Sequence, residues 1–244
     1  MLTDSTFHDK PRNGPARRRD GHKPLTIAVA KGRMLEATAE LLARAGLPAE
    51  TLLDTASRRL VRTAGDITYL ILKPADVATY VEQGVADLGI AGRDSLAESR
   101  RSIIELEDLA FGRCQMVVAG PQPSARKSWL EGKALTGRPL RVATKYPRVA
   151  SDFFNQGSRA AKVIPLHGNI ELAPLMGLAD LVVDIVQTGR TLRENGLEVV
   201  EEIFTSTARL VSSATSLQIK NSEIVNLAGE LARAAGEGVD IAGR

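Results

Sequence analysis

The chain of 244 residues contains one cysteine, Cys114, and three histidines, two of which lie within residues 1–23. A disulfide needs two cysteines, and zinc sites of the usual kind are built mainly from Cys and His ligands. Neither can form within this chain. His167 is the one histidine left for acid–base catalysis, but it precedes Gly168 in a predicted loop, and we interpret it as a loop residue without a catalytic role. Chemistry is therefore expected from Arg, Lys, Asp, Glu, hydroxyl groups and backbone N–H groups, which suit phosphate binding.

Long apolar runs are also missing. No stretch of about 18 apolar residues occurs, so we expect no membrane association. Residues 1–23 are polar and lack the apolar segment of a secretory signal, so we expect a cytoplasmic protein with a disordered polar tail. That tail holds six Lys or Arg and three Asp or Glu, and the other 221 residues hold 26 of each sign. The pI near 9.1 therefore reflects the tail and does not indicate a nucleic-acid-binding body.

From residue 25 onward the sequence alternates between strand and helix patterns. Short apolar runs predict strands at 25–30, 67–72, 88–91, 116–119, 141–144, 162–165 and 181–186. Apolar residues at helical spacing predict helices at 34–45, 74–83, 148–155, 170–178 and 222–235. Such alternation is typical of α/β architecture with largely parallel sheets.

Two segments repeat one pattern with a constant offset of 93 residues. Residues 84–90 and 177–183 share Gly, Ala, Asp and Leu at matching positions. One interpretation is that Gly-x-Ala-Asp is simply a good connector from a helix to a strand. The other is that two similar lobes each deliver a strand end to a shared cleft, since open α/β sheets bind ligands beyond the carboxyl ends of their strands. The second interpretation places 91–93 and 187–191 on opposite walls of that cleft.

The segment 182–191 carries the most specific chemical signal. A branched apolar run ends near Asp184 and then breaks into the turn Thr188-Gly189-Arg190-Thr191. Glycine lets the backbone approach a ligand closely, and the hydroxyl and backbone N–H groups of such a turn can bind a phosphate. Asp184 stands where it could meet a ribose hydroxyl or a magnesium ion. This pattern indicates a site for a phosphorylated sugar, although similar turns also occur in ordinary loops.

Two basic turns accompany this segment. Lys31 and Arg33 flank Gly32 between a predicted strand and a predicted helix, so two cations and a helix N-terminus would converge on one anion. Arg58 and Arg59 form a second basic pair just before a β-like segment. Each turn by itself is equally compatible with a solvated basic loop.

Together these segments resemble the ATP phosphoribosyltransferase family of histidine biosynthesis. The resemblance runs from residue 25 to residue 211. It is carried by ordered matches at 30–33, 76–77, 79–82, 84–92, 111–114, 141–146, 171–175, 184–193 and 195–197. Lys73, Ala78 and Asn169 depart from the Arg, Pro and Ser common in the family. None of the three touches the proposed phosphate loop.

The resemblance implies transfer of the phosphoribosyl group of phosphoribosyl pyrophosphate to N1 of ATP, with release of pyrophosphate and with Mg²⁺ bound to the substrate. The family's long form has an additional C-terminal regulatory domain, and we expect this chain to correspond to the short form. The short form implies a regulatory subunit similar to the catalytic part of histidyl-tRNA synthetase, and a homodimer within a hetero-oligomer.

The fold implied by the resemblance has two lobes, like a type II periplasmic binding protein, with the active site in the cleft between them. We expect lobe I at 24–113 plus 207–244 and lobe II at 114–206. Carried over residue by residue, the family's phosphate loop falls on Asp184, Thr188, Gly189, Arg190 and Thr191. Those five are expected to bind the ribose 5-phosphate.

The family's Lys-Gly-Arg turn falls on Lys31 and Arg33, and its Ser-Arg pair falls on Arg58. The resemblance implies that these three bind ATP and pyrophosphate, with Arg33 and Arg58 as catalytic groups. Two alternatives remain open. An ordinary purine or pyrimidine phosphoribosyltransferase usually has two adjacent acidic residues before its loop, whereas Val183 precedes Asp184 here. A two-lobed small-molecule binding module would leave the basic turns unexplained.

Overall fold

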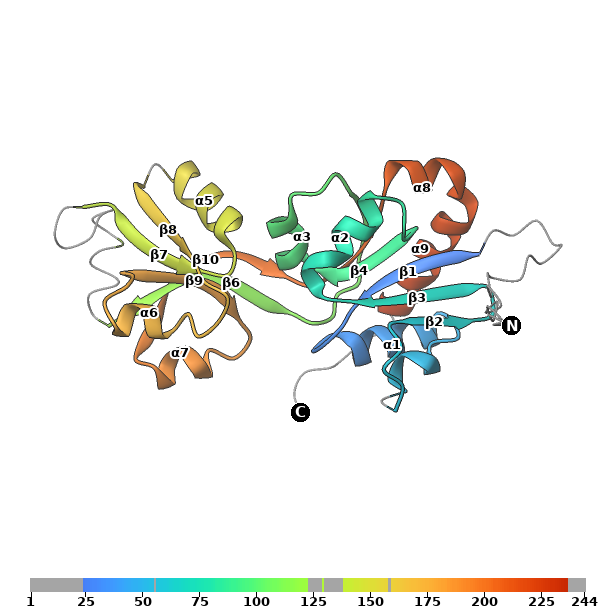
Figure 1. Cartoon of the computed structure of the whole chain (residues 1–244), viewed down its shortest axis with the longest axis horizontal. Coiled ribbons are helices and arrows are strands. Elements are labelled where there is room, and N and C mark those ends of the chain that lie inside the picture. Colours follow the sequence, from blue (N-terminus) through green and yellow to red (C-terminus); the bar gives the residue numbers. More distant parts are fainter. Residues whose placement is uncertain (1–23, 55, 123–128, 130–137, 158, 237–244) are drawn as a thin grey trace, which may run out of the picture.

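The computed structural model describes residues 24–54, 56–122, 129, 138–157 and 159–236, which form two α/β lobes side by side (Figure 1). The tail predicted at 1–23 lies outside the described residues. No helix in the described part of the chain has both the length and the apolar character needed to cross a bilayer.

Lobe I is built on a six-stranded sheet with the order β2-β3-β1-β4-β11-β5. Its strands are β1 (Leu25–Ala30), β2 (Val61–Ala64), β3 (Ile67–Leu72), β4 (Leu88–Gly92), β5 (Ile104–Asp108) and β11 (Ala208–Ser212). Its helices are α1 (Leu35–Arg44), the 3₁₀ turn η1 (Glu50–Leu53), α2 (Pro74–Glu82), α3 (Arg93–Ser99), α8 (Ala214–Ile219) and α9 (Asn221–Gly236).

Strand β1 has apolar side chains on both faces of the lobe I sheet, so both faces must be covered by helices. Successive side chains of a strand point to opposite faces. Ile27 and Val29 belong to the core cluster under α1 and α9, whereas Ala28 and Ala30 belong to the cluster under α2. The unbroken apolar run of β1 is therefore buried on both sides, as in other sheets that helices cover on both faces.

Lobe II is built on a five-stranded sheet with the order β10-β6-β9-β7-β8. Its strands are β6 (Cys114–Pro121), β7 (Leu140–Thr144), β8 (Ala161–Pro165), β9 (Leu181–Val186) and β10 (Leu197–Ser206), and its helices are α5 (Pro147–Gln156), α6 (Leu172–Leu175) and α7 (Arg190–Glu194). Met116 and Val118 of β6 pack in the cluster that includes α5, and Val117 and Ala119 pack in the cluster that includes α6 and α7.

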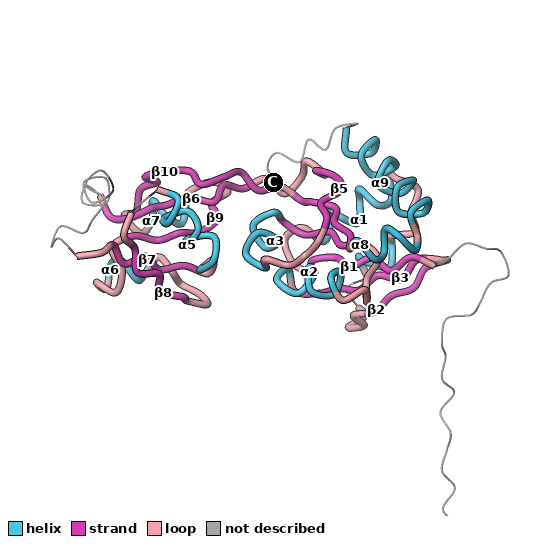
Figure 2. Tube along the Cα trace, turned by 90° about the horizontal axis from the view of Figure 1, so that it is seen from above, coloured by secondary structure: helices cyan, strands magenta, loops and turns pink. Residues whose placement is uncertain are grey.

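The chain crosses between the two lobes twice, from β5 into β6 and from β10 into β11 (Figure 2). Strands β6 and β10 run antiparallel, and Ser206 pairs with Cys114 at the end of their ladder nearest lobe I. The two crossing segments therefore lie side by side and form the connection between lobes. The exact lobe boundaries given above stay predictions.

The expectation of largely parallel sheets is wrong. Strand β1 pairs in parallel with β3 and β4, and β7 pairs in parallel with β8 and β9. Five further pairs are antiparallel: β2–β3, β4–β11, β5–β11, β6–β9 and β6–β10. The reason is topological, because four of these five pairs contain β6, β10 or β11, strands that flank the two crossings.

The repeated Gly-x-Ala-Asp pattern performs the same structural task in both lobes. Gly84 and Gly177 follow α2 and α6 with φ of 68° and 69°, a left-handed conformation that ends a helix. Asp87 then accepts a hydrogen bond from Thr26 N of β1 at 2.8 Å, and Asp180 accepts one from Arg141 N of β7 at 2.8 Å. The motif is thus a helix-to-strand connector that also fastens the neighbouring parallel strand.

Candidate functional site

A cleft of about 840 Å³ lies between the lobes. Residues of lobe I line one wall, from the turn after β1 and from α2 and α3, and residues 145–148, 166–167 and 185 of lobe II line the other. Among the described residues, six that line the cleft are basic and two are acidic: Lys31, Arg33, Lys73, Arg101, Lys145 and Arg148 against Asp94 and Glu98. This excess of positive charge in a concave site favours a polyanionic ligand.

The basic turn predicted from the sequence lies in this cleft. Gly32 has a φ of 99°, which turns the chain from β1 toward α1 and leaves Lys31 and Arg33 exposed on the cleft wall. The Arg33 guanidinium lies 3.5 Å from Gly112 O at the crossing and 3.5 Å from Gln187 Oε1 in lobe II. Its Nη2 lies 3.8 Å from Cys114 Sγ. Arg33 thus joins the basic turn, the crossing and the start of the predicted phosphate loop.

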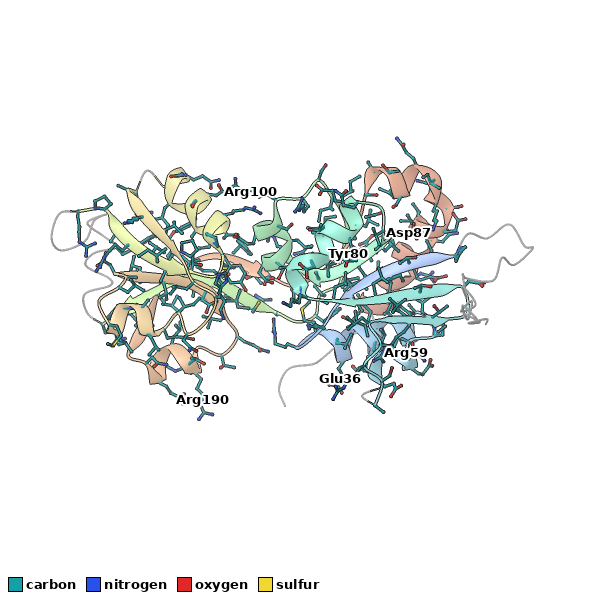
Figure 3. The ribbon with its side chains drawn as sticks, viewed as in Figure 1. Glu36, Arg59, Tyr80, Asp87, Arg100 and Arg190 are labelled. Carbon is teal, nitrogen blue, oxygen red and sulfur yellow. The ribbon has the colours of Figure 1, made fainter. Side chains whose placement is uncertain are left out.

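The predicted phosphate loop connects β9 to α7. Gly189 has a φ of 70° immediately before α7, and Thr188 Oγ1 accepts a long hydrogen bond of 3.4 Å from Arg190 N. The Arg190 guanidinium pairs with Glu194 at 2.7 Å and points outward into solvent (Figure 3). In this arrangement Arg190 faces the loop through its backbone N–H. Residues 187–191, including Thr191, do not line the cleft, and Gln187 makes the contact with Arg33.

Asp184 lies on β9, half-buried just before the loop. Burial raises the pKa of its carboxyl above the usual value, and a backbone hydrogen bond from Ile185 N at 2.9 Å and the charge of Lys145 oppose that rise. Its neighbour Ile185 lines the cleft. A half-buried carboxylate at the carboxyl end of a strand is well placed to accept hydrogen bonds from sugar hydroxyls.

Arg58 is not brought to the cleft. Its side chain is exposed, and the structure gives it no hydrogen bond or ion pair with any described residue. The adjacent Arg59 lies on the part of lobe I that faces away from lobe II (Figure 3). Of the three residues predicted for ATP and pyrophosphate, the fold therefore places Lys31 and Arg33 together and Arg58 apart.

Sequence reasoning missed Asp94 and Tyr146, which meet across the cleft. Asp94 is buried in the first turn of α3 and accepts hydrogen bonds from Ser206 Oγ at 2.7 Å and from Tyr146 Oη at 3.3 Å. Burial and the negative charge of Asp94 raise the pKa of Tyr146, so this phenol stays protonated and acts as a donor. Asp94 could have been predicted as a cleft residue, because it directly follows residues 91–93, which the sequence places on the cleft wall.

A protein-built metal cage is not found within the described residues, since no group of three or more His, Cys, Asp or Glu lies close enough to hold an ion. Asp94 lines the cleft and Asp184 adjoins it. Mg²⁺ prefers oxygen ligands and is often bound by one or two carboxylates together with substrate phosphates. The donor set therefore fits an ion that is held chiefly by a phosphorylated ligand.

Comparison with known proteins places these features in a family context. A family model described as HisG, ATP phosphoribosyltransferase, matches residues 73–233. The chain is 49% identical over 216 residues to the ATP phosphoribosyltransferase of Moorella thermoacetica, covering 88% of this chain and 94% of the relative. It is 40% identical over 219 residues to that of Aquifex aeolicus, covering 90% and 99%.

Solved structures give the same picture. The ATP phosphoribosyl transferase (HisG:HisZ) complex from Thermotoga maritima matches with a TM-score of 0.71 and 33% identity, over 88% of this chain and all of that one. The periplasmic VFT2 domain of Bordetella pertussis BvgS matches with a TM-score of 0.51 and 17% identity, over 88% of this chain and 93% of that one, a likeness of fold alone. The predicted two-lobed α/β fold of the type II periplasmic-binding-protein kind is confirmed.

Proposed function

This chain belongs to the ATP phosphoribosyltransferase family, and we propose that its interlobe cleft is where ATP and phosphoribosyl pyrophosphate react. The enzyme transfers the phosphoribosyl group to N1 of the adenine of ATP and releases pyrophosphate, the first step of histidine biosynthesis. The observation that carries the location is the 3.5 Å contact between the Arg33 guanidinium of lobe I and Gln187 Oε1 of lobe II, which joins the basic turn to the start of the predicted phosphate loop beside a cationic cleft.

The chemistry demands little from a general base. The N1 atom of adenine already carries a lone pair, which forms the new bond to C1′ of the ribose while the bond from C1′ to the pyrophosphate oxygen breaks. The barrier lies in bringing two polyanions together and in stabilising the departing pyrophosphate. Fixed cations aimed at that developing charge are an effective solution. A cleft with six basic side chains supplies such cations.

The proposed roles follow the family resemblance. Asp184, Thr188, Gly189, Arg190 and Thr191 bind the ribose 5-phosphate, with Asp184 facing the sugar hydroxyls. Lys31 and Arg33 bind ATP and pyrophosphate, and Arg33 stabilises the leaving group. Arg58 is assigned the same task on the strength of the family resemblance, although its side chain lies outside the cleft of its own chain in this structure.

The reaction generally needs a metal ion, and we assign Mg²⁺ bound to the pyrophosphate of the substrate. Such an ion would neutralise part of the phosphate charge of the leaving group. Asp94, which lines the cleft, and Asp184, which adjoins it, are the carboxylates that would help to hold it.

The protein is proposed to work with a separate regulatory subunit. The relative of known structure from Thermotoga maritima is a HisG:HisZ complex. By the family resemblance, the partner is similar to the catalytic part of histidyl-tRNA synthetase, and the chain forms a homodimer within the hetero-oligomer. A cytoplasmic location fits both the substrates and this partner.

A spectrophotometric assay of phosphoribosyl-ATP formation tests the proposal. The folded chain is mixed with ATP, phosphoribosyl pyrophosphate and Mg²⁺, with and without the regulatory subunit, and product absorbance is followed. We expect product that depends on both substrates and on the metal. A folded chain that binds ligands yet forms no product under either condition would instead indicate the alternative, a two-lobed small-molecule binding module.

A further inference from the structure

Helices α3 and α5 meet end to end across the gap between the lobes. The carboxylate of Glu98, near the end of α3, accepts hydrogen bonds from Arg148 N at 3.0–3.1 Å and from Val149 N at 3.0 Å, in the first turn of α5. In return, the Arg148 guanidinium donates to Glu98 O at 3.0 Å and to Ser99 O at 2.9 Å, the last carbonyls of α3. Each helix end thus caps the other.

This pairing satisfies groups that helices leave open. The first N–H groups and the last C=O groups of a helix have no partner within it, and they carry partial positive and negative charge, respectively. Glu98 places an anion at the positive end of α5, and Arg148 places a cation at the negative end of α3. Hydrogen bonds to charged groups are stronger than neutral ones. Arg100, which reaches from lobe I toward α5 (Figure 3), adds an ion pair with Asp152.

The same contacts fix the lobe II wall of the cleft. Lys145 and Tyr146 immediately precede α5 and line the cleft together with Glu98, Ser99 and Arg148. Tyr146 N donates to Thr144 Oγ1 at 2.8 Å, so the turn between β7 and α5 is already ordered within lobe II. Docking of α5 on α3 then sets how far Lys145 and Tyr146 stand from the lobe I wall.

We propose that Glu98 and Arg148 are positioning residues that clasp the two lobes together and so set the closed geometry of the cleft. Arg100 and Asp152 complete this α3–α5 clasp. Each lobe has apolar clusters of its own, and the described part of the chain passes between the lobes at two crossings. Weakening the clasp therefore opens the lobes and leaves each lobe folded.

Small-angle X-ray scattering of the full chain without substrates tests the closure directly. Glu98→Gln and Arg148→Met remove the charged partners, and Glu105→Gln is the control, because Glu105 pairs with Arg209 at 2.9 Å within lobe I. We expect a larger radius of gyration for the two clasp variants than for the wild type and for the control, with far-ultraviolet circular dichroism unchanged. A radius equal to that of the control would overturn the proposal.

Kinetics give a second measurement, which rests on the proposed function. We expect KM for both substrates to rise roughly tenfold in the clasp variants, with a smaller change in kcat, because charged hydrogen bonds of this strength bias closure and not the chemical step. Unchanged KM values would overturn the positioning role. If every form is inactive but the scattering difference persists, the proposed function fails and the clasp stands.

Swapping the charges of Arg100 and Asp152 distinguishes the loss of an interlobe ion pair from a general loss of structure. Arg100→Asp alone opposes two acidic groups and is expected to enlarge the radius of gyration, as is Asp152→Arg alone. The double variant R100D/D152R restores opposite charges and should return the radius to the wild-type value. A double variant as open as the single variants would remove this pair from the clasp.

Discussion

At the scale of single residues, Arg33 and Arg58 have different surroundings but the same proposed task. Arg33 lies in the cleft within reach of lobe II. In its proposed role, its removal would take a cation away from the departing pyrophosphate. We expect Arg33→Ala to lower kcat by about 10²–10³, equivalent to about 2.7–4 kcal/mol, with a smaller change in KM. Steady-state kinetics with each substrate varied in turn measures the split, and Arg33→Lys is the matched variant that keeps the charge.

Arg58→Ala is expected to act in the same direction in the same assay. Unchanged turnover would remove Arg58 from the catalytic role and would agree with its exposed position outside the cleft. For Arg33, a change confined to KM would mean that it binds substrate and transition state equally well.

Individual site residues could be predicted where chemistry and local chain geometry coincide. Lys31 and Arg33 flank a glycine between a strand and a helix, so the local sequence already indicates an anion site. Tyr146 gave no such signal, because its partner Asp94 lies 52 positions away and in the other lobe. Arg190 shows that a motif residue need not direct its side chain to the predicted site. It belongs to the Thr-Gly-Arg-Thr turn, but its guanidinium pairs with Glu194, one helical turn further along.

At the scale of elements, the Gly-x-Ala-Asp connector makes a pH-dependent prediction for Asp180. Burial alone would raise the pKa of Asp180, but hydrogen bonds from Arg141 and Arg138 outweigh that effect and hold its pKa below the usual value. A carboxyl whose folded pKa is depressed stabilises the fold above its unfolded pKa of about 3.9, and this contribution is lost as pH falls through the folded pKa. We therefore expect Asp180→Asn to lower the free energy of unfolding by about 1–3 kcal/mol at neutral pH.

Urea unfolding of the wild type and Asp180→Asn at several pH values measures this difference. The difference in the free energy of unfolding between the two proteins should be largest near neutral pH and should shrink steadily below pH of about 4. Asp152→Asn serves as the control, because the ion pair that Asp152 makes among the described residues is with Arg100, which is exposed. A difference between wild type and Asp180→Asn that stays constant across this pH range would show that the charge of Asp180 does not contribute.

Element prediction from the sequence succeeded for the strands with apolar runs and for the helices α1, α2, α5 and α9, and it missed strands that lack an apolar run. The apolar runs of β1, β4 and β9 have no other simple interpretation. In contrast, β5 (Ile104–Asp108) has charged residues at alternate positions, and β10 bulges twice against β6. The helix predicted at 170–178 is only Leu172–Leu175, because Gly177 takes a φ of 69° and ends it early. Pairing direction was mispredicted because the crossing strands are set by the two-lobed topology.

At the scale of the whole molecule, the positive charge expected to attract the substrates is concentrated in the cleft and is not evident from the net charge of the chain. Residues 24–244 hold equal numbers of basic and acidic groups, yet the described residues that line the cleft include six basic and two acidic ones. Attraction of ATP and phosphoribosyl pyrophosphate should therefore come from charges that the fold concentrates between its lobes. Such attraction weakens as salt shortens the screening length, from about 30 Å at 0.01 M to about 3 Å at 1 M.

This location of charge predicts the outcome of removing residues 1–23. The truncated chain loses a net charge of +3 but keeps every described residue that lines the cleft. We expect its kcat/KM to stay within about twofold of the full chain at each salt concentration, and to fall with ionic strength along the same slope. Lys73→Met, which removes one cleft cation, should flatten that slope at equal chain length. If truncation flattened the slope and Lys73→Met did not, the attraction would come from the first 23 residues, and the cleft would lose its role in steering the substrates.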